Sequence, residues 1–232
     1  TIDTTGMDLY DIGAEKAYLE IFKRFAKEQY DVIQGRIGIL GANPLDLSDT
    51  GAADKIRELI PGAVCYGMGS GLADIVRASS AEKNIVLAPS AVKAAKLLEE
   101  RFGTPYEIYD SLAESIITEA LASQAPETDL TGKRILIVDQ QIRANTMRDV
   151  LAERGAAEIN CATWFLQITD LAKTGDFRLK EEDDFEDLVY SGGYDILICD
   201  STMSRIVPDF NGTWIDIPQF PVSGRLGGEG RG

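Results

Sequence analysis

Short runs of apolar residues alternate with longer stretches of helical periodicity along almost the whole chain. Continuous apolar runs predict strands, and they occur at 36–41, 63–67, 84–88, 106–110, 134–139, 158–165 and 195–200. The stretches between them, such as AADKIRELI (52–60) and SAVKAAKLLEERFG (90–103), predict helices. Apolar strands without alternation are covered on both faces, so the pattern predicts an α/β fold of doubly wound parallel sheets joined by right-handed crossovers.

The periodic pattern stops at APETDLTG (125–132), which is polar and contains a proline, and restarts at RILIVD. We therefore predict two Rossmann-like domains, residues 1–126 and 127–226. The glycine-rich end of the chain predicts a flexible tail, residues 227–232. Ser48 or Asp49 is expected to cap the start of the helix over 52–60, and Gly103 is expected to end the helix over 90–103.

Composition narrows the class of protein. With 232 residues and 44% hydrophobic side chains, the chain can bury a sizeable core. The formal charge of −15 argues against nucleic acid and against an anionic membrane surface as partners. No apolar run approaches the roughly 20 residues of a membrane span, and the first residues do not resemble a signal peptide.

Three cysteines and no histidine limit the available chemistry. A Ser-His-Asp triad, a Cys-His pair and an imidazole metal site are excluded within this chain. No two cysteines have a CxxC spacing, so we predict no zinc or iron-sulfur site here. Cys65, Cys161 and Cys199 lie in predicted strands as buried thiols, of which only Cys199 is near enough to a strand end to react. The sparse, odd count is typical of reduced thiols in the cytoplasm.

The stretch GMGSG (67–71) is the most conspicuous glycine cluster, and it lies between a predicted strand and a predicted helix. Backbone N–H groups at such a turn can face an anion. The dinucleotide fingerprint is not met, because the third glycine is misplaced and no acidic residue follows at the required distance. Contact with a ligand and a tight structural turn both remain open for this loop.

Polar side chains follow the other strands, at the edge where α/β proteins bind ligands. In the first half, Asp46 and Asp49 could bind a cation or orient a substrate, but the commoner roles, a solvated Asp46 and a helix-capping Asp49, are expected. In the second half, Arg143 follows the strand 134–139 and could hold an anionic group, although a surface role is commoner. The stretch CDSTMSR (199–205) is the richest polar group there, but its serines have no evident base.

Several segments together resemble the nitrogenase component 1 family of oxidoreductases. They are TIDTTGMDLYDIGAEKAYLEIF, GRIGILGANPLDLSD, GMGSGLADIVRAS, NIVLAPSAVKAAKLLEERFGTPYE, GKRILIVDQQIRANTMRDVLAERGA and DIPQFPVSGRL. The family includes molybdenum-iron protein subunits, their cofactor-assembly scaffolds and the catalytic subunits of dark-operative protochlorophyllide reductase. The resemblance implies three Rossmann-like domains per intact subunit, with a metallocluster or tetrapyrrole held between them. On this basis the chain begins after the first, cluster-binding domain.

The resemblance also implies where this chain departs from a nitrogen-fixing subunit. Leu87, Ala88 and Pro89 stand where molybdenum-iron subunits have a cofactor-ligating cysteine, and the family's histidine is absent. A reductase of another substrate, or an assembly scaffold, fits better. The cofactor would then belong to the intact parent, an iron-sulfur cluster or metallocofactor, with no cofactor in this chain alone. The partners implied are an ATP-dependent iron-sulfur reductase and a paralogous or identical subunit, and the isolated chain is expected to be inactive.

The resemblance gives the glycine loop a role: its backbone would line a cavity between domains. The residues expected at that cavity come from three strand ends, and they are Gly67, Gly69, Ser70, Gly71, Ser90, Gln141 and Arg143. Catalytic residues cannot be assigned, and no metal ligands are expected. A competing hypothesis from another class is a module that binds a nucleotide or an anionic small molecule through GMGSG.

Overall fold

A computed structural model describes residues 9–226 and divides the chain into two compact units, between Ser111 and Leu112. The predicted tail, 227–232, lies outside the described residues. Each unit is an open sheet in which every strand pair is parallel, with helices on its faces. The prediction of two Rossmann-like α/β domains with parallel sheets is therefore confirmed.

The first unit contains a four-stranded sheet of order β2-β1-β3-β4. Its elements are α1 (Tyr10–Phe25), β1 (Ile33–Leu40), α2 (Pro44–Leu47), α3 (Ala52–Leu59), β2 (Ala63–Cys65), α4 (Leu72–Val76), β3 (Ala81–Val86), α5 (Val92–Phe102) and β4 (Tyr106–Ile108). Single 3₁₀ turns cover Ala78–Ser80 and Pro89–Ala91. The strand order reverses between β1 and β3, so the crevice between their carboxyl ends is the usual ligand position of this unit.

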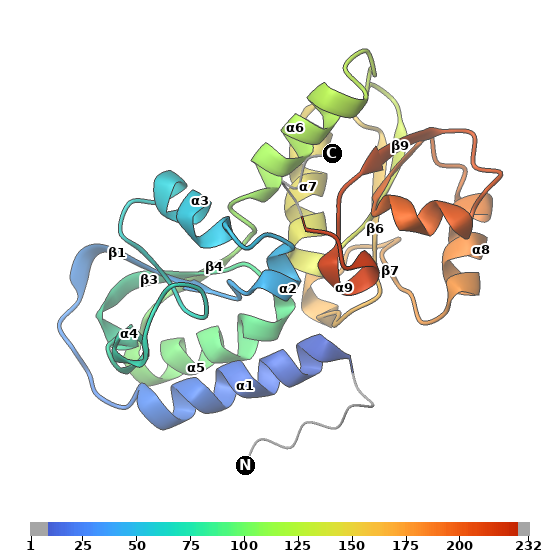
Figure 1. Cartoon of the computed structure of the whole chain (residues 1–232). Helices are drawn as coiled ribbons and strands as arrows, with labels where there is room; N and C mark the ends of the chain where they lie inside the picture. The colour runs from blue at the N-terminus through green and yellow to red at the C-terminus, as the bar shows by residue number, and fades with distance from the viewer. Residues whose placement is uncertain (1–8, 227–232) are drawn as a thin grey trace. The chain divides into compact units, whose positions relative to one another are not determined.

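Helices α1 and α5 cover one face of this sheet, and α3 covers the opposite face (Figure 1). On the α1 face, Phe22 meets Tyr66 edge to face, with ring centroids 5.3 Å apart. Gly38 of β1 leaves room there, because a Cβ at Gly38 would lie 2.1 Å from Oδ1 of Asn84 on β3. On the α3 face, the Cys65 thiol lies 3.9 Å from the carbonyl oxygen of Ala53. Both faces are thus buried, as the continuous apolar strands predict.

The second unit contains a five-stranded sheet of order β7-β6-β5-β8-β9. Its elements are α6 (Ala113–Gln124), β5 (Arg134–Val138), α7 (Gln141–Glu153), β6 (Glu158–Thr163), β7 (Phe177–Arg178), α8 (Glu182–Gly192), β8 (Ile196–Cys199), β9 (Thr213–Asp216) and α9 (Phe220–Ser223), with 3₁₀ turns at Thr169–Leu171 and Ser201–Arg205. Ile135 and Ile137 pack beneath α6 and α7, whereas Leu136 and Val138 pack against α8. The strand order reverses between β5 and β8.

The compact units divide ahead of α6, whereas the sequence places the domain boundary after it, at 126/127. Ile117 and Leu121 of α6 belong to the same apolar cluster as Ile135 of β5. The polar break at 125–132 is a connection inside the second unit, because the helix before it buries its apolar stripe on the sheet that follows. Helix α1 and the short strands β7 and β9 are further elements that the apolar pattern alone does not indicate.

None of the described helices combines the length and apolar character needed to cross a lipid bilayer.

Candidate functional site

The glycine loop turns sharply because two of its glycines occupy the left-handed region of backbone space. Gly67 has φ +111° and Gly69 has φ +70°, conformations that residues with a Cβ rarely adopt. A Cβ on Gly67 would lie 2.7 Å from Oη of Tyr18 and 2.9 Å from the carbonyl oxygen of Ala42. The loop is therefore pressed against α1 and the segment that follows β1.

The start of α4 is already occupied by a carboxylate. Oδ2 of Asp74 accepts a hydrogen bond of 3.1 Å from the Gly71 N–H, and Oδ1 of Asp74 pairs with Arg36 at 3.2 Å. Arg57 donates to the carbonyl oxygens of Met68 and Gly69, at 3.2 Å each. A negative side chain at the N–H group that would meet a phosphate disfavours an anion there. Ser70 Oγ is buried and has no hydrogen-bond partner among the described residues.

A buried polar cluster lies at the carboxyl ends of β1 and β3, where the first sheet reverses its strand order. Asp46 is 4% exposed, so the prediction that it is solvated is wrong. Its carboxylate accepts hydrogen bonds from Tyr10 Oη at 2.7 Å, from Ser90 Oγ at 3.0 Å and from Nδ2 of Asn43. Burial raises the pKa of Asp46, the three hydrogen bonds oppose that rise, and the nearby charge of Asp11 adds to it.

Local sequence explains why Asp46 turns inward. Asn43 caps α2, since its Oδ1 accepts from the N–H groups of Leu45 and Asp46, and Pro44 occupies the first helical position. The pair Asn43–Pro44 was the available sequence signal for this short helix.

Gly51, rather than Ser48 or Asp49, is the cap residue of α3. Asp49 still accepts a hydrogen bond from the Gly51 N–H at 2.7 Å.

In the second unit, Gln141 and Arg143 lie in the first turn of α7, directly after β5. Gln141 donates to the carbonyl oxygen of Ile168 at 2.9 Å and accepts from the N–H of Ile168 at 2.7 Å. Arg143 is only 1% exposed, and one guanidinium nitrogen lies 4.0 Å from Oδ2 of Asp139. Both side chains therefore serve contacts inside the protein, with Gln141 tying the loop around Ile168 to the helix.

The crevice where the second sheet reverses its order is bridged by the chain's own side chains. Gln219, just before α9, donates through its side chain to the carbonyl oxygen of Val138 at the end of β5. Its N–H donates to Oδ2 of Asp200, after β8, at 2.8 Å. Asp200 is fully buried and also accepts from Ser223 Oγ at 2.6 Å. These bonds hold α9 over the edge of the sheet.

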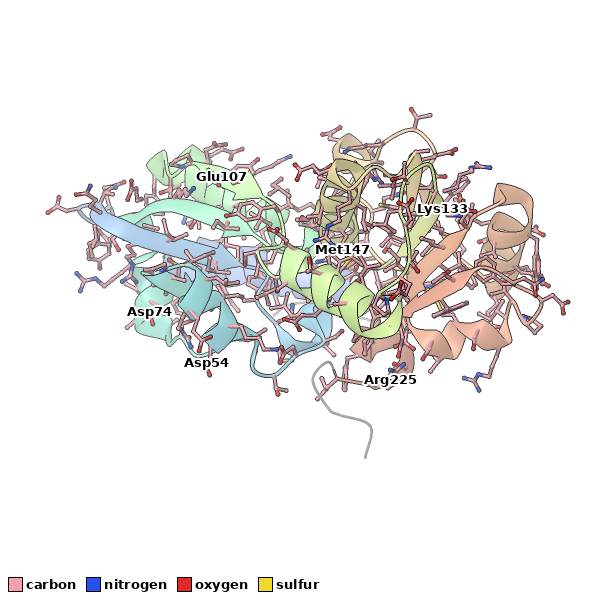
Figure 2. All side chains as sticks on the ribbon, turned by 90° about the horizontal axis from the view of Figure 1, so that it is seen from above. Asp54, Asp74, Glu107, Lys133, Met147 and Arg225 are labelled. Atoms are coloured by element: carbon pink, nitrogen blue, oxygen red, sulfur yellow. The ribbon has the colours of Figure 1, made fainter. Side chains whose placement is uncertain are left out.

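Arg225 completes this arrangement from beyond α9, and it is labelled in Figure 2. Its guanidinium pairs with Asp216 at 2.6 Å and with Asp200 at 3.3 Å, and it donates to Ser201 Oγ at 2.8 Å. Burial raises the pKa of Asp216, but the bonds from Arg225 and from the Ser201 N–H outweigh it, so that the pKa is lowered. The arginine that lies at this edge is thus Arg225, which no motif in the sequence singles out. Arg205, the last residue of the polar stretch CDSTMSR, is exposed.

The thiols do not form a reactive or metal-binding group. Cys65, Cys161 and Cys199 are free and buried. Burial raises the pKa of Cys161 to about 12 and that of Cys199 well above its usual value, with the neighbouring aspartates adding to the rise at Cys199. Cys199 is therefore not the reactive thiol that its place near a strand end allowed. Within residues 9–226, no three His, Cys, Asp or Glu side chains are grouped so that they could hold a metal ion.

The residues predicted to share one cavity are divided between the two units. Gly67, Ser70 and Ser90 belong to the first, and Gln141 and Arg143 to the second. Ser90 is 1% exposed and Gln141 3%, and their polar atoms are bonded inside their own units. A cavity common to all of these residues stays a prediction.

Comparison with known proteins gives a relationship at the level of the fold. No protein-family profile matches the chain, and no curated protein matches it significantly. Among solved structures, nitrogenase Cp1 at pH 6.5 is similar with a TM-score of 0.61 and 14% identity, over 90% of this chain and 58% of that one. Nitrogenase Cp1 at pH 5 gives a TM-score of 0.58 at 13% identity, over 91% and 57%.

The ligand-free aspartate transcarbamoylase of Trypanosoma cruzi covers 91% of this chain and 80% of its own at 14% identity, but its TM-score of 0.36 is too low to relate the folds. The chain spans less than two thirds of the length of the nitrogenase Cp1 chain that it matches. At these identities the likeness to nitrogenase Cp1 shows a shared fold and nothing finer.

Proposed function

We propose that this chain is part of a nitrogenase component 1-like oxidoreductase subunit and supplies walls of its substrate or cofactor cavity. The observation that carries the proposal is the likeness of the fold to nitrogenase Cp1 over 90% of the chain. The segments that resemble the component 1 family, from GRIGILGANPLDLSD to DIPQFPVSGRL, run through both units. The likeness of the fold is thus the support for the proposal, and the resemblance of these segments agrees with it.

The side chains of this chain do not fit a metallocluster. Iron-sulfur clusters are held by sets of thiolates, whereas the three thiols here lie in separate strands, and burial raises the pKa of each. The chain has no histidine to take their place. A cluster or metallocofactor of the intact protein would need ligands from outside these residues, and no redox step is assigned to them.

The carboxyl edges of the sheets support a role in shaping a cavity. In each unit, the crevice where strand order reverses is bridged by hydrogen bonds, from Ser90 to Asp46 in the first and from Gln219 to Asp200 in the second. Side chains that are already bonded form a rigid, preorganised wall and do not have to be ordered when a ligand arrives. Electrons would come from an ATP-dependent iron-sulfur protein, and a paralogous or identical subunit would complete the assembly.

An assembly scaffold would have the same fold and the same walls, and it differs only in passing its cofactor onward. The nucleotide- or anion-binding module has less support, because the Asp74 carboxylate occupies the N–H at the start of α4. Thermal-shift measurements with NAD, ATP and a sugar nucleotide separate that module from the other two. A ligand that binds only the folded state at 100 times its Kd stabilises by about 2.7 kcal/mol, so a clear shift with any of them favours the module.

The proposal is tested on the natural gene product in its full length, purified without oxygen. With an ATP-dependent iron-sulfur reductase from the same cells, we expect MgATP hydrolysis coupled to oxidation of the reductase. The present chain alone, reconstituted with iron and sulfide, should retain no stoichiometric iron and should not oxidise the reductase. A full-length protein without iron, or one that never accepts electrons, contradicts the proposal. Release of its cofactor to a second protein without turnover identifies a scaffold instead.

A further inference from the structure

The glycine loop borders a pocket that lies entirely within the first unit. Its walls come from α1, from the segments after β1 and β2, and from Ile75 of α4, and its volume is about 360 Å³. Asn43 and Pro44 follow β1, and Tyr66 and Gly67 follow β2, so the pocket opens at the carboxyl ends of two neighbouring strands. This is the edge at which α/β proteins bind small ligands.

The walls of this pocket are uncharged. None of the described residues that line it carries a formal charge, in a chain whose net charge is −15. The phenols do not ionise at ordinary pH, because burial raises the pKa of Tyr66 to about 12 and also raises the pKa of Tyr18. Moving a charged ligand into such surroundings without a partner is strongly unfavourable, so the pocket selects an uncharged ligand.

Three aromatic rings and two small side chains line the pocket. Tyr18, Phe22 and Tyr66 supply rings, and Tyr18 is held in place because its Oη donates to the Tyr66 carbonyl oxygen at 3.0 Å. Ala14 and Ala17 supply small side chains from α1. Aromatic contacts are worth about 0.5–1.5 kcal/mol beyond the area that they bury, and the two alanines leave room beside the rings for a flat molecule.

Two further features mark the pocket as a binding site. Leu45 lines it and is 38% exposed, which places an apolar side chain at its rim. Gly67 lines it without a side chain, and a Cβ there would collide with Oη of Tyr18. A cavity of about 150 Å³ lined by apolar side chains holds benzene, so the present volume suits about two fused rings. Ligand pockets in general begin at about 300 Å³.

We propose that the pocket between α1 and the ends of β1 and β2 binds an uncharged aromatic small molecule of about two fused rings. The first glycine of GMGSG keeps the loop against α1, so that the cavity stays open and its wall stays free of side-chain bulk. The proposal concerns the first unit alone and does not depend on the oxidoreductase role.

The test uses naphthalene as the probe and the chain with labelled methyl groups. Titration should give saturable shifts of the Ala14, Ala17, Leu45 and Ile75 methyl resonances, and 2-naphthoate, which has the same rings and a charge, should bind at least about tenfold more weakly. Ala17→Phe, which fills the pocket from α1, should weaken naphthalene binding by about tenfold or more. Ala152→Phe, an exposed position on α7, is the matched control and should leave binding unchanged.

The proposal is overturned if naphthalene gives no saturable shift, or if Ala17→Phe binds it as well as the natural chain does. It is also overturned if the same methyl groups shift with protein concentration alone, because a second copy of the chain would then occupy the pocket. Should Ala17→Phe not fold, Ala14→Leu narrows the same wall with a smaller change and is expected to weaken binding in the same direction.

Discussion

Ser90 Oγ donates a hydrogen bond of 3.0 Å to Oδ2 of Asp46, across 44 positions of the sequence. The bond joins the segment after β1 to the segment after β3, at the point where the first sheet reverses its strand order. The bond supplies one of the donors that a buried carboxyl needs, so Asp46 has hydrogen-bond partners without a cation beside it.

Asp46 should make the stability of the chain depend on pH. Burial raises its pKa in the folded state, so the folded chain binds a proton more readily than the unfolded chain, whose aspartate pKa is about 3.9. The contribution of Asp46 is fully present below that value and is lost as pH rises through the folded pKa. The free energy of unfolding of Asp46→Asn, relative to the natural chain, should therefore increase as pH rises from about 4 toward 7.

Urea unfolding at several pH values measures this difference, with Asp31→Asn, an exposed position, as the control for simple removal of charge. A difference between Asp46→Asn and the natural chain that stays constant with pH would show that Asp46 does not titrate differently in the two states.

The glycines of GMGSG should differ sharply in their tolerance of a methyl group. Gly67→Ala places a Cβ within 3 Å of Tyr18 and Ala42 at φ +111°, and such overpacking costs about 1–3 kcal/mol. Gly71→Ala meets no atom within 4 Å and should cost less than about 1 kcal/mol, the usual loss when alanine takes a helix N-cap. Denaturant midpoints of the two variants give the comparison. Equal losses at both positions would mean that the loop is not packed against Tyr18.

Arg225 should stabilise the second unit through the aspartates that it joins. In Arg225→Gln, Asp200 and Asp216 lose their charged partner while Asp200 stays buried, which costs about 1–3 kcal/mol near neutral pH. The pKa values of both carboxyls are lowered in the folded state, where hydrogen bonds outweigh burial. Their contribution is present above the unfolded pKa and is lost as pH falls through the folded values.

The difference between Arg225→Gln and the natural chain should therefore shrink in acid, below about pH 4. Arg205→Gln removes an exposed arginine from the same edge, where its one described hydrogen bond is a 3.4 Å contact with the carbonyl oxygen of Thr202, and serves as the control. If both variants lose the same stability at pH 7, the network around Arg225 contributes nothing of its own.

The three thiols should be unreactive in the folded chain. Cys65, Cys161 and Cys199 are buried, and the thiolate is the nucleophile in disulfide exchange. A colorimetric disulfide reagent at pH 8 should label none of them quickly in native protein and all of them after unfolding. Rapid labelling of one thiol in native protein would contradict this prediction. Loss of that labelling in Cys199→Ser would identify Cys199 as the reactive thiol.

Much of the architecture could be predicted because the local composition of a segment indicates whether it forms a buried strand. The run RILIVD indicated β5, and Gly103, predicted to end a helix, adopts the left-handed cap of α5 at φ +72°. The sites were harder to predict because they depend on contacts between distant segments. Nothing in the local sequence distinguishes Arg225 from Arg205. Only Arg225, of the two, pairs with Asp200, which follows β8, and with Asp216, the last residue of β9.

The amino-acid sequence by itself determined the layered parallel sheets, the absence of histidine chemistry and the placing of cysteines in strands, because these follow from composition and from the period of apolar residues. Tertiary structure decided which polar groups are buried together and which domain receives α6. Asp46 has the local sequence of a solvated aspartate and becomes a buried acceptor only because β1 and β3 are neighbours. Burial and pairing are properties of the assembled sheet, and no short window of sequence contains them.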